Sequence, residues 1–367
     1  MSQAIYVAGT GQHRGKTLVS LGLAAALRDR GFIVRYMKPV GQRAIPWEES
    51  LVDEDVILLH QMDGLTPNVP CASPVTLPHG FTTRFLRGDC DSATLRDRIA
   101  QSFAELSDGA DLVLVEGTGH AGVGSVVGLC NAAVAALLGA RVVIVTPGGI
   151  GRPIDEFALN RALFDQHGVR IIGVIANKFH EERREQVEPL LRCWFERQGA
   201  PLLGAIPYEP LLTELTLRQI ATEIGAKVLC GEEALDQHIR ECVIMSTPHQ
   251  LLELVRPGVL ALIPGSRDDL LLTAMTCAHL THLAPGFIAV CLTDDALPQP
   301  STLQVVCQSG VPVIASPRDT YQVAAEISDL VAKMTPNDEE KIELCKRLVA
   351  QHVDLDALLH GALGVEE

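Results

Sequence analysis

The chain has 367 residues, of which 47% are hydrophobic, 20% charged and only 4% aromatic. This length and composition exclude a disordered or fibrous protein and predict about two globular domains with aliphatic cores. The chain carries 30 Lys and Arg against 45 Asp and Glu, a formal net charge of −15. Such a surface repels nucleic acid and anionic membranes, so we expect neither as a partner. This negative net charge does not exclude one locally positive pocket that binds a small anion.

The sequence predicts a protein of the cytoplasm. No apolar run reaches the roughly 18–20 residues that a membrane span needs. Residues 1–11 lead directly into a strand pattern without a basic segment, so we expect no signal peptide. The ten cysteines are scattered, without a CxxC pair. Because Cys230, Cys291 and Cys307 lie in apolar segments, we expect reduced cysteines in the core.

Short aliphatic runs alternate with helical patterns along most of the chain, which is typical of βαβ units and a parallel sheet. In the first part we expect a helix over 16–30, ended by Gly31 as its C-terminal cap. Further helices are expected from near Ser92 and over 153–167. The strands expected in this part are 4–8, 34–37, 112–115, 142–145, 171–176 and 202–206.

The pattern changes after Pro207. A polar connector over 208–225 leads into a second alternation of strands and helices, which predicts a second, smaller α/β domain. The strands expected there are 226–229, 259–263, 287–292 and 311–315. The helices expected there lie near 248–255, 268–280 and 301–309, with closing amphipathic helices over 320–334 and 337–361. The predicted domains are 1–210 and 211–335, followed by C-terminal helices over 336–367.

The strongest functional signal lies between the first expected strand and the first expected helix. It reads Gly9-Thr10-Gly11-Gln12-His13-Arg14-Gly15-Lys16-Thr17. Backbone N–H groups of such a turn and of the helix N-terminus converge on one point, which favours a phosphate-binding loop over an ordinary tight βα turn. The match to G-x-x-x-x-G-K-[ST] is imperfect, because Thr10 replaces the first glycine. The predicted nucleotide-binding residues of the loop are Gly11, Gln12, His13, Arg14, Gly15, Lys16 and Thr17; Leu18 is not assigned.

Four more polar residues are candidates for the site, and three of them follow expected strands. Glu116 ends a buried strand, where a carboxylate either holds Mg²⁺ or caps the next loop. Lys38 follows the second strand at the same sheet edge as the loop, and either contacts a phosphate or lies at the surface. Asp55 belongs to an acidic run that is either a metal ligand or a solvated helix start. Asn177 ends another strand, where its amide can bind a purine edge.

Taken in this order, these segments resemble dethiobiotin synthetase, an ATP-dependent carboxylase and cyclising ligase. That family carries GTDTxVGKT, YKP, an Asp in a helix, VEGAGG, an Asn after a strand and APLLGxIPW. This chain has GTGQHRGKT, YMKP, Asp55, VEGTGH, Asn177 and APLLGAIPY, within residues 1 to 210.

The resemblance implies ATP and Mg²⁺ as cofactors and gives each matching residue a role. Asn177 would read adenine, and Lys38 would face the transferred group. The implied catalytic residues are Lys16, Lys38 and Glu116. The implied metal ligands are Thr17, Asp55 and Glu116.

The chain departs from that family at Gly11 and His13, which replace an Asp and a Glu of the loop. The stretches 119–125 and 148–156 are more similar to the synthetase-like N-terminal domain of long phosphate acetyltransferases and their stand-alone homologues. In those proteins the second domain is of the DRTGG type, which residues 211–320 resemble. The expected fold class is therefore α/β, a P-loop domain with a doubly wound, mostly parallel sheet followed by a smaller DRTGG-like α/β domain. No acetyltransferase domain follows, so we do not expect acetyl transfer by this chain alone.

Three functions stay open from the sequence. The first is an ATP- and Mg²⁺-dependent ligase or ATPase, in which a carboxylate, carbamate or similar oxyanion attacks the γ-phosphate. The second is a regulatory protein that binds ATP or ADP and senses a ligand or partner through its second domain. Biotin synthesis itself is the third. The second substrate or protein partner is not identified, and the resemblance implies a homodimer or higher homo-oligomer.

Overall fold

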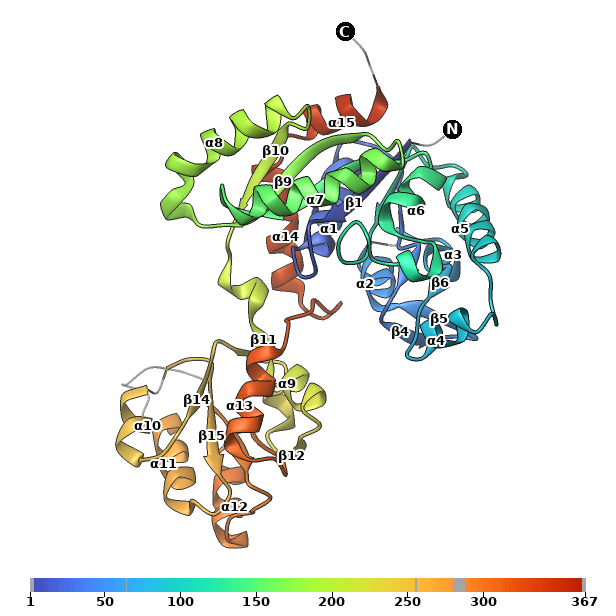
Figure 1. Ribbon diagram of the computed structural model, residues 1–367. Coiled ribbons are helices and arrows are strands. Elements are labelled where there is room, and N and C mark those ends of the chain that lie inside the picture. Colours follow the sequence, from blue (N-terminus) through green and yellow to red (C-terminus); the bar gives the residue numbers. More distant parts are fainter. Residues whose placement is uncertain (1–2, 64, 255, 280–287, 365–367) are drawn as a thin grey trace. The chain divides into compact units, whose positions relative to one another are not determined.

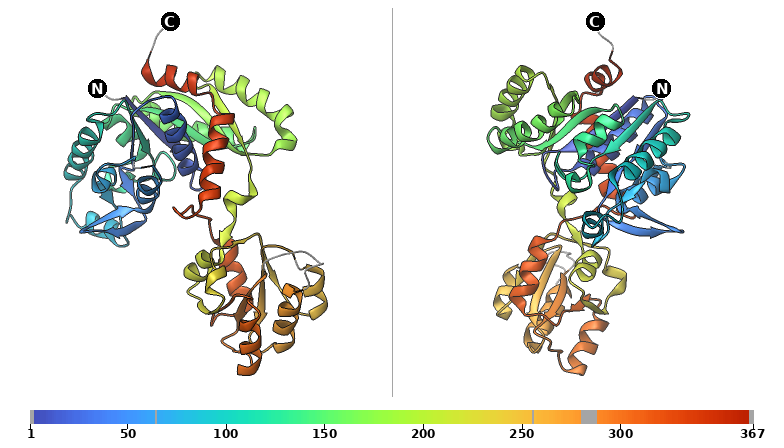
Figure 2. Two further views of the ribbon diagram at one scale, coloured as in Figure 1. Left: turned by 180° about the vertical axis from the view of Figure 1, so that it is seen from behind. Right: turned by 45° about the vertical axis from the view of Figure 1, so that its right-hand side comes forward.

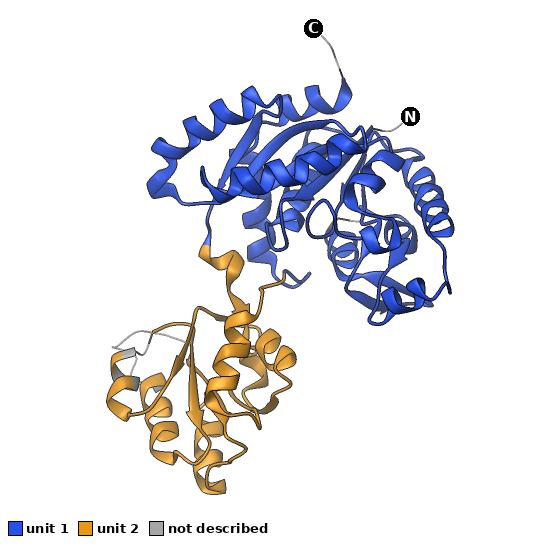
Figure 3. Ribbon diagram, viewed as in Figure 1, with its two compact units in different colours: residues 1–209, 334–367 blue, residues 210–333 orange. Residues whose placement is uncertain are grey.

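The computed structural model describes residues 3–63, 65–254, 256–279 and 288–364. The chain forms two compact units, one of residues 1–209 with 334–367 and the other of residues 210–333 (Figure 3). The C-terminal segment, expected as a separate closing element, packs within the first unit. Within the described residues, no helix has both the length and the apolar character needed to cross a bilayer.

A six-stranded sheet forms the centre of the first unit, in the order β10-β9-β8-β1-β7-β2, and all of its neighbouring strands are parallel. Its strands are β1 (Gln3–Gly9), β2 (Val34–Met37), β7 (Leu112–Glu116), β8 (Arg141–Pro147), β9 (Ile171–Phe179) and β10 (Leu202–Pro207). Along the chain, β1 is followed by the edge strand β2, then by β7 beside β1, and then by β8, β9 and β10 on the other side of β1. In a parallel sheet of this kind, ligands bind at the carboxyl ends of the strands where the order reverses. The expected doubly wound parallel sheet is confirmed.

Helices cover both faces of this sheet. Helices α7 and α8 lie on one face, and α1 and α14 lie on the other (Figures 1 and 2). The longer helices of this unit are α1 (Lys16–Asp29), α2 (Glu54–Asp63), α5 (Ser92–Ser107), α6 (Asn131–Leu137), α7 (Arg152–Gln166), α8 (Arg184–Arg197), α14 (Glu339–His352) and α15 (Leu355–Leu363). The expected helices 16–30, from near 92 and 153–167 correspond to α1, α5 and α7.

Shorter elements complete the first unit. They are the paired strands β3 (Val40–Gly41) and β6 (Val75–Thr76), the hairpin β4 (Ala44–Trp47) and β5 (Ser50–Asp53), the helices α3 (Val69–Ala72) and α4 (Phe81–Leu86), and the 3-10 turns η1 (Ser125–Val127) and η2 (Glu181–Arg183). The antiparallel hairpin β4–β5 lies between β3 and α2 and was not predicted.

The C-terminal helix α14 packs on α1 at Gly22. A Cβ atom at this position would collide with Val349, and it would lie 2.9 Å from the carbonyl oxygen of Cys345. The end of α14 also meets the edge strand β10, where Val353 forms an antiparallel bridge to Gly204. Glycine at these two contacts therefore lets the end of the chain join the core that carries the phosphate-loop helix.

The second unit has a five-stranded sheet in the order β12-β17-β16-β15-β14, in which only β12 is antiparallel to its neighbour. Its strands are β12 (Lys227–Cys230), β14 (Glu241–Ile244), β15 (Val259–Pro264), β16 (Ile288–Thr293) and β17 (Val313–Ala315), with a small pair β11 (Leu215–Thr216) and β13 (His238–Ile239). Its helices are α9 (Leu217–Glu223), α10 (Pro248–Leu254), α11 (Asp268–His279), α12 (Pro300–Gln308) and α13 (Thr320–Asp329), with 3-10 turns η3 (Pro210–Thr213) and η4 (Glu232–Ala234).

Two apolar clusters lie within this second unit. One cluster contains Leu270 and Val306 from α11 and α12, and the other contains Ile220 and Val323 from α9 and α13. The expected smaller α/β domain is confirmed. The ends of three expected elements, at 255, 280 and 287, lie outside the described residues.

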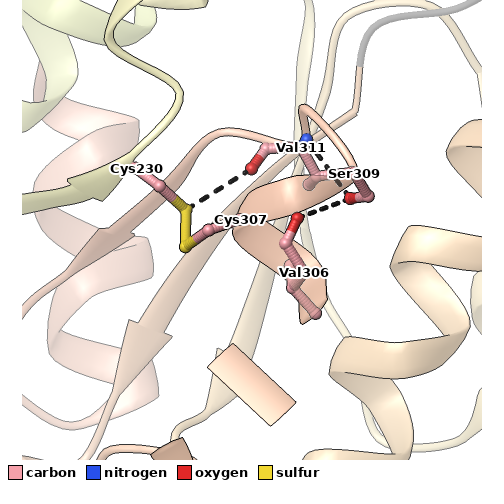
Figure 4. Close-up of a disulfide and its surroundings, with 5 residues drawn as sticks. All are labelled: Cys230, Val306, Cys307, Ser309 and Val311. Atoms are coloured by element: carbon pink, nitrogen blue, oxygen red, sulfur yellow. Dashed lines mark hydrogen bonds between the residues drawn. A yellow bond between two sulfur atoms is a disulfide. The ribbon is translucent and has the colours of Figure 1, made fainter. Parts of the chain in front are cut away.

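The expectation of reduced cysteines is wrong for one pair. Cys230 at the end of β12 and Cys307 in α12 form a disulfide, with their Cα atoms 5.5 Å apart (Figure 4). This separation is ordinary for a disulfide. The two residues are 77 positions apart in sequence, so only the packing of α12 beside the edge strand brings them together. Cys291, the third cysteine of that expectation, is buried and free.

Candidate nucleotide-binding site

The segment between β1 and α1 has the backbone of a phosphate-binding loop. His13 and Gly15 have positive φ angles of 56° and 93°, so the chain turns sharply twice before α1 begins. A side chain at Gly15 would collide with the amide of Asn177, so only glycine fits there. Among the residues described, no side chain caps α1. The first N–H groups of the helix therefore point freely toward the place where an anion would bind.

Lys16 bridges two loops at the carboxyl edge of the sheet. Its Nζ donates to the carbonyl oxygens of Gly11, at 3.3 Å, and Gly119, at 3.1 Å. The side chain is buried, and burial lowers the pKa of Lys16 to about 8 despite the opposing charge of Glu116. Carbonyl oxygens are weak partners for a buried ammonium. Phosphate oxygens at the same place would be stronger partners.

Glu116, at the end of β7, joins the loop to the neighbouring strand. Its carboxylate accepts hydrogen bonds from the Thr17 hydroxyl at 2.9 Å and from the Tyr36 hydroxyl at 3.0 Å. Glu116 is 1% exposed, and this burial raises its pKa, while Lys38 acts in the opposite direction. Tyr36 was not among the predicted residues; the only sequence signal for it was its place in the YMKP motif.

Lys38 lies among three carboxylates. Its Nζ hydrogen bonds to Asp55, lies 3.0 Å from Asp53 Oδ1 and lies 3.9 Å from Glu116 Oε1. Burial alone lowers the pKa of Lys38, but Asp55, Glu116 and Asp53 outweigh it and hold the pKa above its usual value. Lys38 is therefore charged at neutral pH, and the surface interpretation of this residue is wrong.

Asp53 is the partner of Lys38 that sequence reasoning missed. It is 1% exposed, and its Oδ2 accepts backbone N–H groups from Gln42 at 3.1 Å and Arg43 at 3.3 Å. The two aspartates of the acidic run therefore differ in role. Asp53 both contacts Lys38 and fixes the loop before the hairpin, whereas the Asp55 carboxylate contacts Lys38. Neighbouring carboxylates in one short run do not reveal this division in the sequence.

The oxygen donors of this cluster fit a magnesium ion. The Thr17 hydroxyl and the Glu116 carboxylate already touch, and Asp55 reaches the same Lys38 ammonium as Glu116. Mg²⁺ is usually bound through one or two carboxylates together with substrate phosphates and water. Within the described part of the chain, no group of three or more His, Cys, Asp or Glu side chains is arranged as a complete metal site. The donor set thus suits an ion that arrives with a nucleotide.

Asn177 holds the phosphate loop in place. It is 2% exposed, and its Nδ2 donates to the carbonyl oxygen of Arg14 at 2.9 Å. The amide thus bonds to the loop backbone from the end of β9. Its expected contact with adenine stays a prediction.

The loop after β7 is fixed by Asn131 at the start of α6. Its Oδ1 accepts from the Tyr6 hydroxyl at 2.8 Å and from the backbone of Thr118 at 3.0 Å. Its Nδ2 donates to the carbonyls of Thr118, at 2.8 Å, and His120, at 2.6 Å. The carbonyl of Gly119, which accepts from Lys16, is therefore presented by a rigid loop. Neither Asn131 nor Tyr6 was predicted, because their partners lie more than ten residues away.

The fold and this site define a P-loop protein, and comparison with protein families agrees. The family described as AAA domain matches residues 3–216, more than half of the chain, and the DRTGG domain matches residues 219–330. The chain therefore belongs to the AAA domain family and carries a DRTGG domain behind it.

Individual relatives match either most of the chain or only a little more than half of it. A phosphate acetyltransferase of Synechocystis is 26% identical over 98% of this chain and 52% of its own length, so the chain spans about half of that relative. An ATP-dependent dethiobiotin synthetase of Xanthomonas campestris is 30% identical over 56% of this chain and 92% of its own length. Among solved structures, the septum site-determining protein MinD of Pyrococcus horikoshii, complexed with Mg-ADP, covers 58% of this chain and 84% of its own at 17% identity and a TM-score of 0.36.

Proposed function

We propose that this protein is an ATP- and Mg²⁺-dependent ligase or ATPase that transfers the γ-phosphoryl group to a small carboxylate or carbamate. The observation that carries the proposal is the charge cluster beside the phosphate loop, in which Lys38 contacts Asp55 and lies within 3.9 Å of Glu116. The 30% identity to a dethiobiotin synthetase over 56% of this chain supports it. The second substrate would bind beyond the loop, on the side of Lys38.

Nucleotide binding would use the loop backbone and Lys16. The polyphosphate would replace the carbonyls of Gly11 and Gly119 as the partners of the Lys16 ammonium, while the N–H groups at the start of α1 donate to its oxygens. A bound Mg²⁺ would offset the negative charge that develops during transfer. Thr17, Asp55 and Glu116 are the residues that would hold it.

The same carboxylates hold Lys38 and would hold the metal. With Asp55 and Glu116 holding the metal, the Lys38 ammonium would donate to the transferred group and stabilise its charge. Asp53 does not take part in this exchange, because its other oxygen is bound to the backbone of Gln42 and Arg43. It keeps Lys38 in position throughout.

Release of ADP in the presence of candidate acids and amines tests this function. We expect at least one small carboxylate or carbamate-forming amine to accelerate ADP release, and we expect Lys38→Met to reduce the accelerated rate by about 100-fold. Lys227→Met, at an exposed position of β12 in the other unit, is the matched control and should leave the rate unchanged. Turnover that no substrate raises above background, or an accelerated rate that Lys38→Met leaves intact, would contradict the proposal.

A regulatory function is the second candidate, and the packing of α14 favours it. The chain leaves the DRTGG domain near residue 333 and enters α14, which packs on the phosphate-loop helix α1. A nucleotide would bind at α1, which contacts α14. A ligand or partner would bind the DRTGG domain, which directly precedes α14 in the chain, so both would act on α14. Slow hydrolysis that no substrate accelerates, together with a homo-oligomer whose size changes with ATP or ADP in light scattering, would support this function. An oligomer whose size does not change when ATP or ADP is added would contradict this function.

Biotin synthesis is tested separately. Incubation with diaminopelargonate, bicarbonate and Mg-ATP would yield dethiobiotin if the chain retained that reaction. We expect none, because Gly11 and His13 replace the acidic residues of the synthetase loop.

A further inference from the structure

Tyr36 is a buried side chain of β2 that contacts Glu116, one of the residues proposed to hold the metal. It is 0% exposed, and its hydroxyl donates to Glu116 Oε2 at 3.0 Å. In the parallel pair of β2 and β7, Tyr36 is the partner of Leu114, which lies two positions before Glu116. Because side chains alternate between the two faces of a strand, Tyr36 and Glu116 lie on the same face of the sheet. The contact therefore follows from the register of two neighbouring strands.

The two oxygens of the Glu116 carboxylate have different partners. Oε1 accepts from the Thr17 hydroxyl at 2.9 Å and lies 3.9 Å from Lys38 Nζ, so it is the oxygen on the side of the proposed metal ligands and of Lys38. Oε2 accepts from Tyr36. A hydrogen bond on each oxygen fixes the rotation of the carboxylate, as the partners behind a metal-binding carboxylate commonly do. Glu116 therefore presents Oε1, and not Oε2, to an ion at the start of α1.

The Tyr36 hydroxyl is a permanent donor to Oε2. Burial, and then the charge of Glu116, hold the pKa of Tyr36 well above its usual value, so the hydroxyl stays protonated at neutral pH. Water does not compete at a fully buried hydroxyl, and a hydrogen bond is stronger in such surroundings. Separating the two groups would leave the buried Oε2 without this donor, which is costly. Tyr36 and Oε2 therefore stay paired while an ion binds at Oε1.

We propose that Tyr36 is a positioning residue through which Glu116 selects Mg²⁺ over Ca²⁺. With Oε2 bound to Tyr36, only Oε1 serves the ion, directly or through water. Mg²⁺ is bound through few carboxylate oxygens and keeps several waters, whereas Ca²⁺ takes more oxygen ligands and often both oxygens of one carboxylate. A carboxylate limited to one oxygen therefore suits Mg²⁺. This inference rests on the metal and nucleotide binding proposed above.

Calorimetric titration of ATP with excess Mg²⁺, with excess Ca²⁺ and with EDTA tests the assignment. The gain from each cation is the ATP affinity in its presence divided by the affinity in EDTA. Tyr36→Phe keeps the buried ring and removes only the hydroxyl, which releases Oε2. We expect the magnesium gain to fall and the calcium gain to rise, so that the ratio of the two gains falls by about 10-fold.

The matched control is Tyr6→Phe, which removes the hydroxyl of another tyrosine on the same sheet. Tyr6 is 1% exposed, and its hydroxyl donates to Asn131 at 2.8 Å instead of to Glu116. This variant should keep the native ratio of the two gains even if its ATP affinity changes. An unchanged ratio in Tyr36→Phe, or an equal fall in both variants, would show a merely structural role for Tyr36 and overturn the inference.

The native chain separates the failure of this inference from that of the proposed function. If the native chain does not bind ATP more tightly with Mg²⁺ than with EDTA, the proposed function itself is wrong. If it does, and Tyr36→Phe keeps the native ratio, only the assignment of Tyr36 is wrong. Should Tyr36→Phe not fold, the two gains of the native chain decide: a magnesium gain at least about threefold above the calcium gain supports the assignment, and equal gains overturn it.

Discussion

At the scale of single residues, the site joins side chains from four separate segments through Glu116 and Lys38. The resemblance to dethiobiotin synthetase implied Lys16, Thr17, Lys38, Asp55 and Glu116 as the residues of one site. The structure does bring these five side chains together. It adds Asp53 and Tyr36, whose contacts depend on how β2, β5 and β7 pack. Motif spacing carries no information about such packing.

Lys16 should make the stability of the free protein depend on pH. Its folded-state pKa is about 8, below the ordinary lysine value of 10.5, so between these values the unfolded chain binds more protons and the free energy of unfolding rises with pH. The penalty from the buried charge is present at pH 7 and relieved near pH 10. Lys16→Met lacks this penalty, so its stability advantage over the native chain should shrink by on the order of 2 kcal/mol between pH 7 and pH 10. Urea unfolding at both pH values measures the difference. A constant difference would contradict the burial of a charged Lys16.

Glu116 should determine how nucleotide affinity depends on Mg²⁺. Glu116→Gln keeps an acceptor for the hydroxyl groups of Thr17 and Tyr36 but removes the negative charge. We expect the native chain to bind ATP more tightly with Mg²⁺ than with EDTA, and we expect the variant to lose most of this gain. Calorimetric titrations under both conditions check it. A variant with the same magnesium-dependent gain as the native chain would remove Glu116 from the metal site.

At the scale of elements, alternating aliphatic runs located the long strands and helices, because a sheet buried on both faces needs continuous apolar strands. All five residues of β7 are buried, for example. The same criterion missed β14 and the hairpin β4–β5, whose residues are mostly exposed or half-buried. It also missed the disulfide between Cys230 and Cys307, which depends on the placement of α12 beside β12. Exposed edge strands and cross-links lack the apolar signal on which the prediction relied.

The contact between α1 and α14 should be sensitive to one methyl group. Gly22→Ala would normally favour a helix by about 1 kcal/mol, but here the added Cβ collides with Val349 and crowds the backbone of Cys345. We expect a net loss of about 1–3 kcal/mol in the free energy of unfolding. Combining it with Val349→Ala should cost less than the sum of the single losses, because the second change removes one colliding atom. Strict additivity in denaturant unfolding would place α14 away from Gly22.

At the scale of the whole molecule, the DRTGG domain is an insertion between β10 and α14. The first unit closes only when residues 334–367 return to it. The amphipathic pattern of the last helices predicted that they pack somewhere, but such a pattern does not say against which core. In the structure, α14 and the chain after it approach closely at Gly22 and Gly204. These two contacts define the core against which the C-terminal helices pack.

This arrangement predicts opposite outcomes for two truncations. Residues 210–333 contain both apolar clusters of their unit, so this fragment should fold alone and melt cooperatively. Residues 1–333 lack α14, with its buried Ile342, Leu344, Cys345, Leu348 and Val349, and should lose most of the stability of the phosphate-loop unit. Thermal unfolding followed by circular dichroism compares both with the full chain. A fragment 210–333 without a transition, or a first unit that melts unchanged without α14, would contradict this division.

Calorimetric titration of Mg-ATP into the full chain and into Lys16→Ala tests the central claim most directly. If the loop before α1 holds the polyphosphate, the native chain binds and the variant loses about 100-fold or more in affinity, while Lys227→Ala binds like the native chain. Equal affinities for the native chain and Lys16→Ala would contradict a nucleotide site at this loop.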